Sequence, residues 1–277
     1  MLSLGYGVVA YALSQLLVAV LFIVVYSLIG CQLVDLRGVK GVILKNDIKD
    51  IVQKGLGYMT TPVWQSIFFQ GSTFVVRIAL GAEAVAVFNT VRTVCRSVNQ
   101  VFSIINASIF PDLQYEYGKG NLPLVQKYFR MAVLLSMVVG LLGTICLIVC
   151  GLDLYEWWTR SALSVPYEVW AVFMVGVLLN AVWWTSVVTY RMTNKPYHFA
   201  IASTITSILS VGVTYLFSLQ FGLIGAAIGC TFFELVMAIY VLPDSCRNLQ
   251  MRASDLFCNI KADANAIVSK VLGTLRH

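Results

Sequence analysis

Long, uninterrupted apolar runs restrict what this sequence can fold into. Hydrophobic residues make up 59% of its 277 residues and charged residues 12%, about half the charged fraction of an ordinary soluble domain. A transmembrane helix needs about 20 apolar residues. The sequence predicts seven such helices, over residues 4–30, 56–80, 84–110, 129–151, 166–190, 198–219 and 222–243. We therefore expect an all-α integral membrane protein.

Short polar, glycine or proline segments mark where these helices should end. We expect breaks at residues 80–83, 194–196 and 221–222, and we expect the third helix to stop at Pro111. An outer loop is predicted over residues 152–166. The expected domains are a first helix over 1–30, a cytoplasmic connector over 31–55, a six-helix lobe over 56–243 and a cytoplasmic tail over 244–277.

The distribution of lysine and arginine predicts the orientation. Fifteen of the nineteen basic residues fall in the segments expected on one side of the membrane, Arg160 alone falls on the other side, and three lie within spans. Positively charged loops stay in the cytoplasm. The carboxyl terminus should therefore be cytoplasmic.

A repeat relates the first and last predicted helices. Residues 7–14 and 222–229 both read Gly, two apolar, small, any, Ala, apolar, small. Small residues at this spacing let helices approach closely. Chance resemblance between two apolar helices is the alternative. A true repeat would make residues 1–30 the last helix of a preceding lobe that is missing from this sequence.

Three arginines, Arg77, Arg92 and Arg96, lie inside predicted spans. Arginine keeps its charge, and placing one at the bilayer centre costs at least about 3 kcal/mol. Such residues face a protein interior or a water-filled cavity, so we expect a cationic cavity. Guanidinium groups suit phosphate oxygens through paired hydrogen bonds. The predicted cargo therefore carries a phosphate or pyrophosphate, with a carboxylate sugar as a variant.

Helical periodicity places these arginines on polar stripes. In the third span one face carries Asn89, Arg92, Arg96, Asn99, Ser103 and Asn106, and the second span carries Ser66, Gln70, Thr73 and Arg77 on one stripe. From these sets we predict the substrate-binding residues Arg77, Arg92, Arg96, Gln70, Asn89, Asn99 and Asn106.

Glu234 is the one acid that lies firmly within a predicted span. It has two interpretations: a salt-bridge partner of one arginine, or a protonatable coupling site. Asn180, also within a span, is expected to hydrogen-bond between helices rather than to bind ligand.

The sequence offers no motif for catalysis, metal binding or a cofactor. It has no phosphate-cradling glycine loop and no GxSxG motif. The seven cysteines show no CxxC spacing and no pairing with histidine, so no metal site and no disulfide framework are predicted. The net charge of +6 lies in short loops and does not indicate a nucleic-acid partner.

Three motifs resemble a known family. They are Phe221 to Gly229 with Glu234 five residues on, Ile109 to Leu113 followed by Tyr117 to Asn121, and Asn194 to Tyr197. In order and spacing they are similar to Wzx-type polysaccharide (O-antigen) flippases of the multidrug/oligosaccharidyl-lipid/polysaccharide exporter superfamily. The chain resembles the carboxyl-terminal portion of these proteins.

The resemblance implies two six-helix lobes around a central cavity, of which this chain would carry one complete lobe. It implies flipping of undecaprenyl-pyrophosphate glycan across the bacterial inner membrane by alternating access, without enzymatic activity. The implied partners are membrane lipid, the lipid-linked oligosaccharide, a separate amino-terminal lobe, and the glycan polymerase with its chain-length machinery.

Three other functions compete with this one. A cation-coupled drug or metabolite exporter of the same superfamily should show carboxylates and aromatic rings in its cavity rather than arginines. A membrane polymerase or ligase should have a long outer loop with catalytic residues, and the loop over 152–166 is short. The last alternative is an inactive truncated fragment.

Overall fold

The computed structural model describes residues 8–33, 45–161 and 163–258, and within these ranges it contains helices and no strand. The chain divides into two compact units, Met1–Asp50 and Ile51–His277, which are described separately. The predicted all-α membrane architecture is confirmed.

The first unit contains α1 (Val8–Leu33), a helix of 26 residues without a charged side chain. Within it, Ala12–Gln32 is long and apolar enough to cross a membrane. The first seven residues, where the expected repeat begins, lie outside the described part of the chain.

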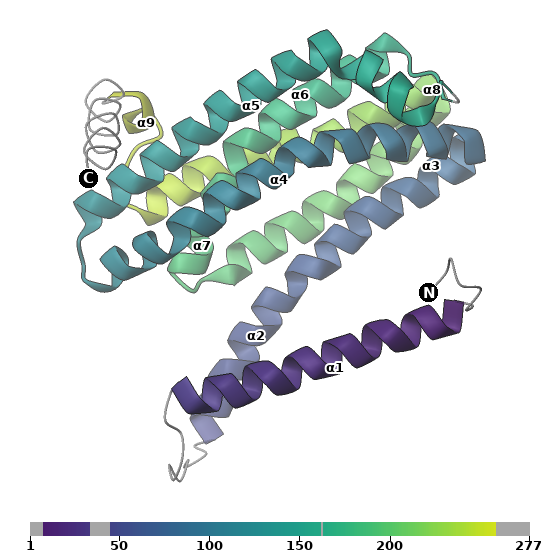
Figure 1. Ribbon diagram of the computed structural model, residues 1–277. Helices are drawn as coiled ribbons and strands as arrows, with labels where there is room; N and C mark the ends of the chain where they lie inside the picture. Colours follow the sequence, from purple (N-terminus) through teal and green to yellow (C-terminus); the bar gives the residue numbers. More distant parts are fainter. Residues whose placement is uncertain (1–7, 34–44, 162, 259–277) are drawn as a thin grey trace, which may run out of the picture. The chain divides into compact units, whose positions relative to one another are not determined.

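The second unit is a bundle of long helices, drawn in Figure 1. Helix α2 (Lys45–Ser66) begins just before the boundary between the units and continues through a π turn, η2 (Ile67–Gly71), into α3 (Ser72–Leu80). The other elements follow in chain order: α4 (Ala82–Gly118), α5 (Leu122–Thr159), α6 (Tyr167–Trp183), the 3-10 turn η3 (Thr185–Val187), α7 (Val188–Met192), α8 (Pro196–Asn248) and the short α9 (Asp255–Cys258).

Three of the predicted breaks occur where the backbone takes a positive φ. Gly81 has φ 87° between α3 and α4, and Asn194 has φ 53° just before Pro196 begins α8. Gly222 has φ 60° and ψ −137° within α8. Glycine and asparagine tolerate this region better than other residues. The breaks at 80–83, 194–196 and 221–222 are confirmed.

The break at Gly222 folds α8 into a hairpin of two tightly packed halves. A Cβ atom on Gly229 would lie 2.3 Å from Thr214 Oγ1, and one on Gly225 would lie 2.0 Å from the Phe217 carbonyl oxygen. Ser210 Oγ donates a 2.7 Å hydrogen bond to the Gly229 carbonyl across the hairpin. The small residues of the 222–229 motif therefore allow two helices to pack almost backbone to backbone.

The prediction that Pro111 ends the third helix is wrong, because α4 continues to Gly118. Proline removes one backbone hydrogen bond. Leu113, two residues on, is fully buried against Val125 and Phe129 of α5, and this packing holds the helix together. The loop predicted over 152–166 is also shorter than expected, since α5 extends to Thr159.

Four of the described helices are long and apolar enough to cross a membrane: Ala12–Gln32, Leu122–Thr159, Tyr167–Met192 and Pro196–Asn248. The last of these contains two predicted spans, on either side of Gly222. The helices that carry the arginines, α3 and α4, are not among the four, so the spans predicted over 56–80 and 84–110 are not found among them. The chain is a multi-pass membrane protein.

Two apolar clusters hold the second unit together. One lies at the end of the bundle where α4 ends, α5 begins and α8 ends, and it includes Leu113, Val125, Met192 and Leu249. The other is aromatic: the ring of Phe233 stacks on Phe68 at 4.3 Å and on Trp64 at 5.3 Å, and lies 6.0 Å from Trp183. This aromatic cluster brings α2, η2, α6 and the second half of α8 to one place.

Candidate functional site

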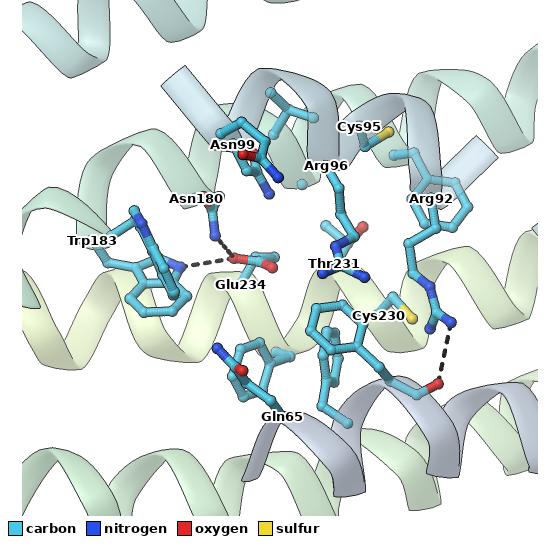
Figure 2. A pocket seen from close by; sticks show the side chains of 18 of the residues that line it. Gln65, Arg92, Cys95, Arg96, Asn99, Asn180, Trp183, Cys230, Thr231 and Glu234 are labelled. Carbon is cyan, nitrogen blue, oxygen red and sulfur yellow. Dashed lines mark hydrogen bonds between the residues drawn. The ribbon is translucent and has the colours of Figure 1, made fainter. Parts of the chain in front are cut away.

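A cavity of about 200 Å³ lies within the second unit, against the aromatic cluster. Its polar lining residues come from four parts of the bundle, and most of them are labelled in Figure 2: Gln65, Arg92, Arg96, Asn99, Asn180, Thr231 and Glu234. Gln100 and Ser103 also line it. The cavity has room for several water molecules or a small polar headgroup.

Arg92 is held in place by neutral oxygen atoms of α3 and η2. Its Nη1 donates to Ser72 Oγ at 2.8 Å, and its Nη2 donates to Thr73 Oγ1 at 2.7 Å and to the Phe69 carbonyl at 3.1 Å. Nη2 also donates to Asn89 Oδ1, one turn earlier on α4, at 2.7 Å. Within the described ranges no carboxylate pairs with Arg92. Its charge is therefore solvated by the protein but not neutralised.

At the π turn a backbone acceptor for Arg92, the Phe69 carbonyl, lies next to the hydroxyls of Ser72 and Thr73. A π-helical segment loosens the regular i to i−4 bonding of the backbone. The Phe69 carbonyl accepts from Thr73 Oγ1 at 2.8 Å as well as from Arg92, and Ser72 Oγ also donates to the Phe68 carbonyl. Arg92 thus ties α4 to η2 at the point where the backbone of η2 departs from α-helical geometry.

Arg96, one turn further along α4, has different surroundings. Its guanidinium lies over the ring of Phe69 at 4.6 Å, and its side chain is exposed. The Arg92 guanidinium approaches the same ring at 5.2 Å. In the part of the chain that the structure describes, Arg96 makes no hydrogen bond and no ion pair through its side chain. Its donors are therefore free to bind a ligand.

Glu234 lies on α8 and is bound by neutral donors from α6. Asn180 Nδ2 donates to Glu234 Oε2 at 2.9 Å, and Trp183 Nε1 donates to the same oxygen at 2.7 Å. In Figure 2 these two side chains approach the carboxylate from one side, and Arg96 lies on the other. Of the two interpretations of Glu234, a direct salt bridge with an arginine is not formed among the described residues. The expected interhelical bond of Asn180 is present.

The remaining predicted site residues are dispersed. Asn99 lines the cavity, and its Oδ1 is buried with no partner among the described residues. Asn89 does not line it and acts by orienting Arg92. Arg77 and Gln70 are exposed and do not line it. Asn106 lies in a neighbouring cavity, where its Nδ2 donates to the Trp184 carbonyl at 3.0 Å.

Several cavity residues were not predicted from the sequence. The aromatic lining, with Trp64 and Phe69 among its members, could not be told from ordinary apolar core residues by helical spacing. Thr231 has a clearer signal, because it lies three residues before Glu234 and hence on the same helical face. Its hydroxyl donates to the Val172 carbonyl at 3.1 Å and joins α8 to α6.

The cavity therefore combines two guanidinium groups with one carboxylate, and the opposite charges are not paired with each other. Each charge is instead hydrogen-bonded by neutral groups or lies against an aromatic ring. Such a site favours a ligand with an anionic group near Arg96 and hydrogen-bond donors near Glu234. Over the described ranges, no group of three or more His, Cys, Asp or Glu side chains could hold a metal ion.

No protein-family model and no curated protein matches this chain. Several solved structures of MATE transporters match its fold. A crystal structure of a MATE point mutant aligns with TM-score 0.68 at 17% sequence identity, over 76% of this chain and 48% of that chain. MATE in a bent conformation aligns with TM-score 0.67 at 18% identity, over 83% of this chain and 50% of that chain. MATE in complex with MaD5 aligns with TM-score 0.63 at 17% identity.

These alignments show that most of this chain shares the fold of the matched MATE structures. The chain spans about half the length of the matched structures. The expected fold is therefore confirmed, at a sequence identity that shows the architecture alone.

Proposed function

We propose that this chain is one lobe of a transporter that flips a phosphorylated, lipid-linked glycan, with undecaprenyl-pyrophosphate glycan as the cargo. The observation that carries the proposal is the Arg96 guanidinium, which borders the cavity with its donors unused, one turn from the unneutralised charge of Arg92. Guanidinium donors match phosphate oxygens in geometry and charge.

Such a lobe must replace the water that the phosphorylated headgroup loses when it enters the membrane. Moving an ionised headgroup into hydrocarbon costs on the order of tens of kcal/mol in the idealised case. A hydrated cavity with Arg96 at its wall lowers that barrier, and Arg92 adds a second positive charge behind it. The prenyl tail stays in lipid while the cavity receives the headgroup.

The rest of the proposal concerns the assembled protein. This lobe rocks against a second lobe, so that the cavity opens alternately to the two sides of the bacterial inner membrane. The basic ends of α4, α7 and α8 face the cytoplasm, together with the carboxyl terminus. The glycan polymerase and the chain-length machinery would take over the delivered cargo.

A second candidate, a cation-coupled exporter of drugs or metabolites, also has support. The cavity contains the carboxylate and the aromatic rings that this function calls for: Glu234, Trp64, Phe173, Trp183 and Phe233. In this account Glu234 takes up and releases the coupling cation. The two unpaired arginines favour the flippase, because they repel a cationic drug.

The two candidates are separated by deleting the gene and complementing it with variants. The flippase account expects a lipid-linked glycan to accumulate in the deletion strain, and expects Arg96→Gln to restore surface glycan poorly at wild-type protein level. The exporter account expects normal surface glycan, together with drug sensitivity that Glu234→Gln fails to correct. Normal glycan in both the deletion strain and the Arg96→Gln strain would exclude the flippase.

A further inference from the structure

A second cavity, of about 370 Å³, lies beside the first in the same unit. Its lining residues come from α2, α4, the end of α6, η3, α7 and the start of α8. Four residues line both cavities: Trp64, Gln65, Ser103 and Trp184. A single layer of side chains therefore separates the two spaces.

Two residues that line the second cavity carry buried polar atoms with no partner in the described part of the chain. Trp64 is 2% exposed, and its Nε1 has no acceptor among the described residues. Asn106 Oδ1, on the polar face of α4, is likewise buried and has no donor there. An unpaired buried donor or acceptor costs about 1–3 kcal/mol. Both residues line the second cavity, and a small rotation of either side chain would turn its unpaired atom toward a polar occupant there.

Arg191 supplies a positive charge at this cavity. Its guanidinium lies over the ring of Phe110 at 5.1 Å, and its side chain is exposed. Across the described ranges it forms no ion pair. The carboxylate of Asp244 accepts from the hydroxyl of Tyr190, the residue before Arg191. This arrangement repeats that of Arg96, which also combines a ring contact with free donors.

The boundary between the cavities lies where a helix changes its geometry. Trp184 Nε1 donates to Ser103 Oγ at 3.1 Å, joining the end of α6 to α4. The 3-10 turn η3 begins at the next residue. Trp183, the residue before Trp184, donates a hydrogen bond to Glu234 in the first cavity. The adjacent indoles of Trp183 and Trp184 thus make hydrogen bonds in the first cavity and at the boundary between the cavities. A short 3-10 segment within a longer helix is a common place for a hinge.

We propose that the second cavity is a second binding station for a phosphate-bearing headgroup, with Arg191 as its cation and Asn106 and Trp64 as its hydrogen-bonding groups. This inference rests on the proposed function. A headgroup that moves along the polar face of α4, from Arg96 past Ser103, reaches Asn106 in the second cavity. The phosphate can belong to the cargo or to an anionic membrane lipid, because the recognising chemistry is the same.

The experiment is equilibrium binding of radiolabelled inorganic pyrophosphate to the full chain in nanodiscs of phosphatidylcholine. We expect about two equivalents for the wild type, about one for Arg191→Gln, about one for Arg96→Gln and none for the double variant. Arg191→Lys keeps a phosphate-binding cation and should retain about two equivalents. A thermal unfolding midpoint equal to that of the wild type confirms that each variant is folded.

The outcomes separate the two proposals. If Arg191→Gln binds as much pyrophosphate as the wild type, the second station does not exist. If Arg191→Gln loses one equivalent and Arg96→Gln loses none, the second station stands and the first cavity is not a phosphate site. In nanodiscs that contain phosphatidylglycerol, loss of the Arg191-dependent equivalent alone identifies the lipid phosphate as the occupant.

Discussion

Arg92 and Arg96 lie one turn apart on α4, and their surroundings give them different roles. The guanidinium of Arg92 is surrounded by oxygen acceptors from three side chains and one carbonyl, whereas Arg96 touches a ring and has free donors. Arg92 therefore positions η2 and its Phe69 ring. Arg96 is the side chain that is placed to meet a ligand.

Replacing each arginine with lysine should separate these roles. Arg92→Lys loses the planar group that bridges α4, η2 and α3, and we expect it to lower the free energy of unfolding by about 2 kcal/mol. Arg96→Lys should unfold like the wild type. Thermal unfolding in detergent, followed by tryptophan fluorescence, measures both. An Arg92→Lys variant as stable as Arg96→Lys would contradict the positioning role.

Glu234 allows a test of charge against hydrogen bonding. In Glu234→Gln the amide oxygen can still accept from Asn180 and Trp183, so we expect the stability to stay within about 0.5 kcal/mol of the wild type. Glu234→Leu leaves both buried donors unpaired and should cost about 2–3 kcal/mol. Unfolding midpoints of the two variants provide the comparison. Equal losses for both variants would show that the charge itself holds α6 and α8 together.

At the scale of the elements, the α8 hairpin depends on the absence of side chains at its closest contact. A Cβ on Gly229 would meet backbone atoms of Thr214 at 2.4 Å and 2.6 Å, which a rotamer change cannot relieve. We expect Gly229→Ala to destabilise the protein by about 2–3 kcal/mol through overpacking. Folded yield and unfolding midpoint measure this effect.

The control for this substitution lies in the same helix. A Cβ on Gly212 would have no neighbour within 4 Å. Alanine is the better helix former by about 1 kcal/mol, so Gly212→Ala should leave the stability unchanged or raise it. If both variants lose stability equally, close packing of the hairpin is not the cause.

Helix spacing in the sequence was enough to predict part of the site. It placed Arg92, Arg96 and Asn99 on one face of one helix, because a single helix fixes which residues share a face. It could not show that Ser72 and Thr73 accept from Arg92, since that depends on how α3 packs against α4. Helix spacing also could not show that Arg92 and Arg96 line the cavity while Arg77 lies outside it, because this too depends on how α3 packs against α4.

The ends of the helices could also be predicted only in part from the sequence. Positive φ values at Gly81, Asn194 and Gly222 mark breaks that residue type predicts well. Pro111 was misleading, because a local preference yielded to the burial of Leu113 in a cluster shared with α5 and α8. Local signals were reliable where the backbone itself requires a residue type, and unreliable where packing between distant helices decides.

At the scale of the whole molecule, the bundle collects basic residues at one end. Lys119, Arg191 and Arg247 follow or end α4, α7 and α8, whose ends meet in one apolar cluster, and Arg160 follows the opposite end of α5. The positive-inside rule predicts that the first three lie in the cytoplasm. A fluorescent protein fused to the carboxyl terminus should fluoresce, and a periplasmic phosphatase fused there should be inactive. The reverse pattern would invert the topology.

The central claim is that a free guanidinium at Arg96 receives the phosphate of a lipid-linked cargo. It is tested most directly by the initial rate of flipping of a fluorescent prenyl-pyrophosphate glycan in proteoliposomes that contain this lobe and its partner lobe. One lost charge-assisted hydrogen bond corresponds to about a tenfold to hundredfold effect. We predict that Arg96→Gln slows flipping at least tenfold, and that Arg96→Lys keeps more of the rate than Arg96→Gln does. Equal rates for the wild type and Arg96→Gln, at equal protein content, would contradict the account.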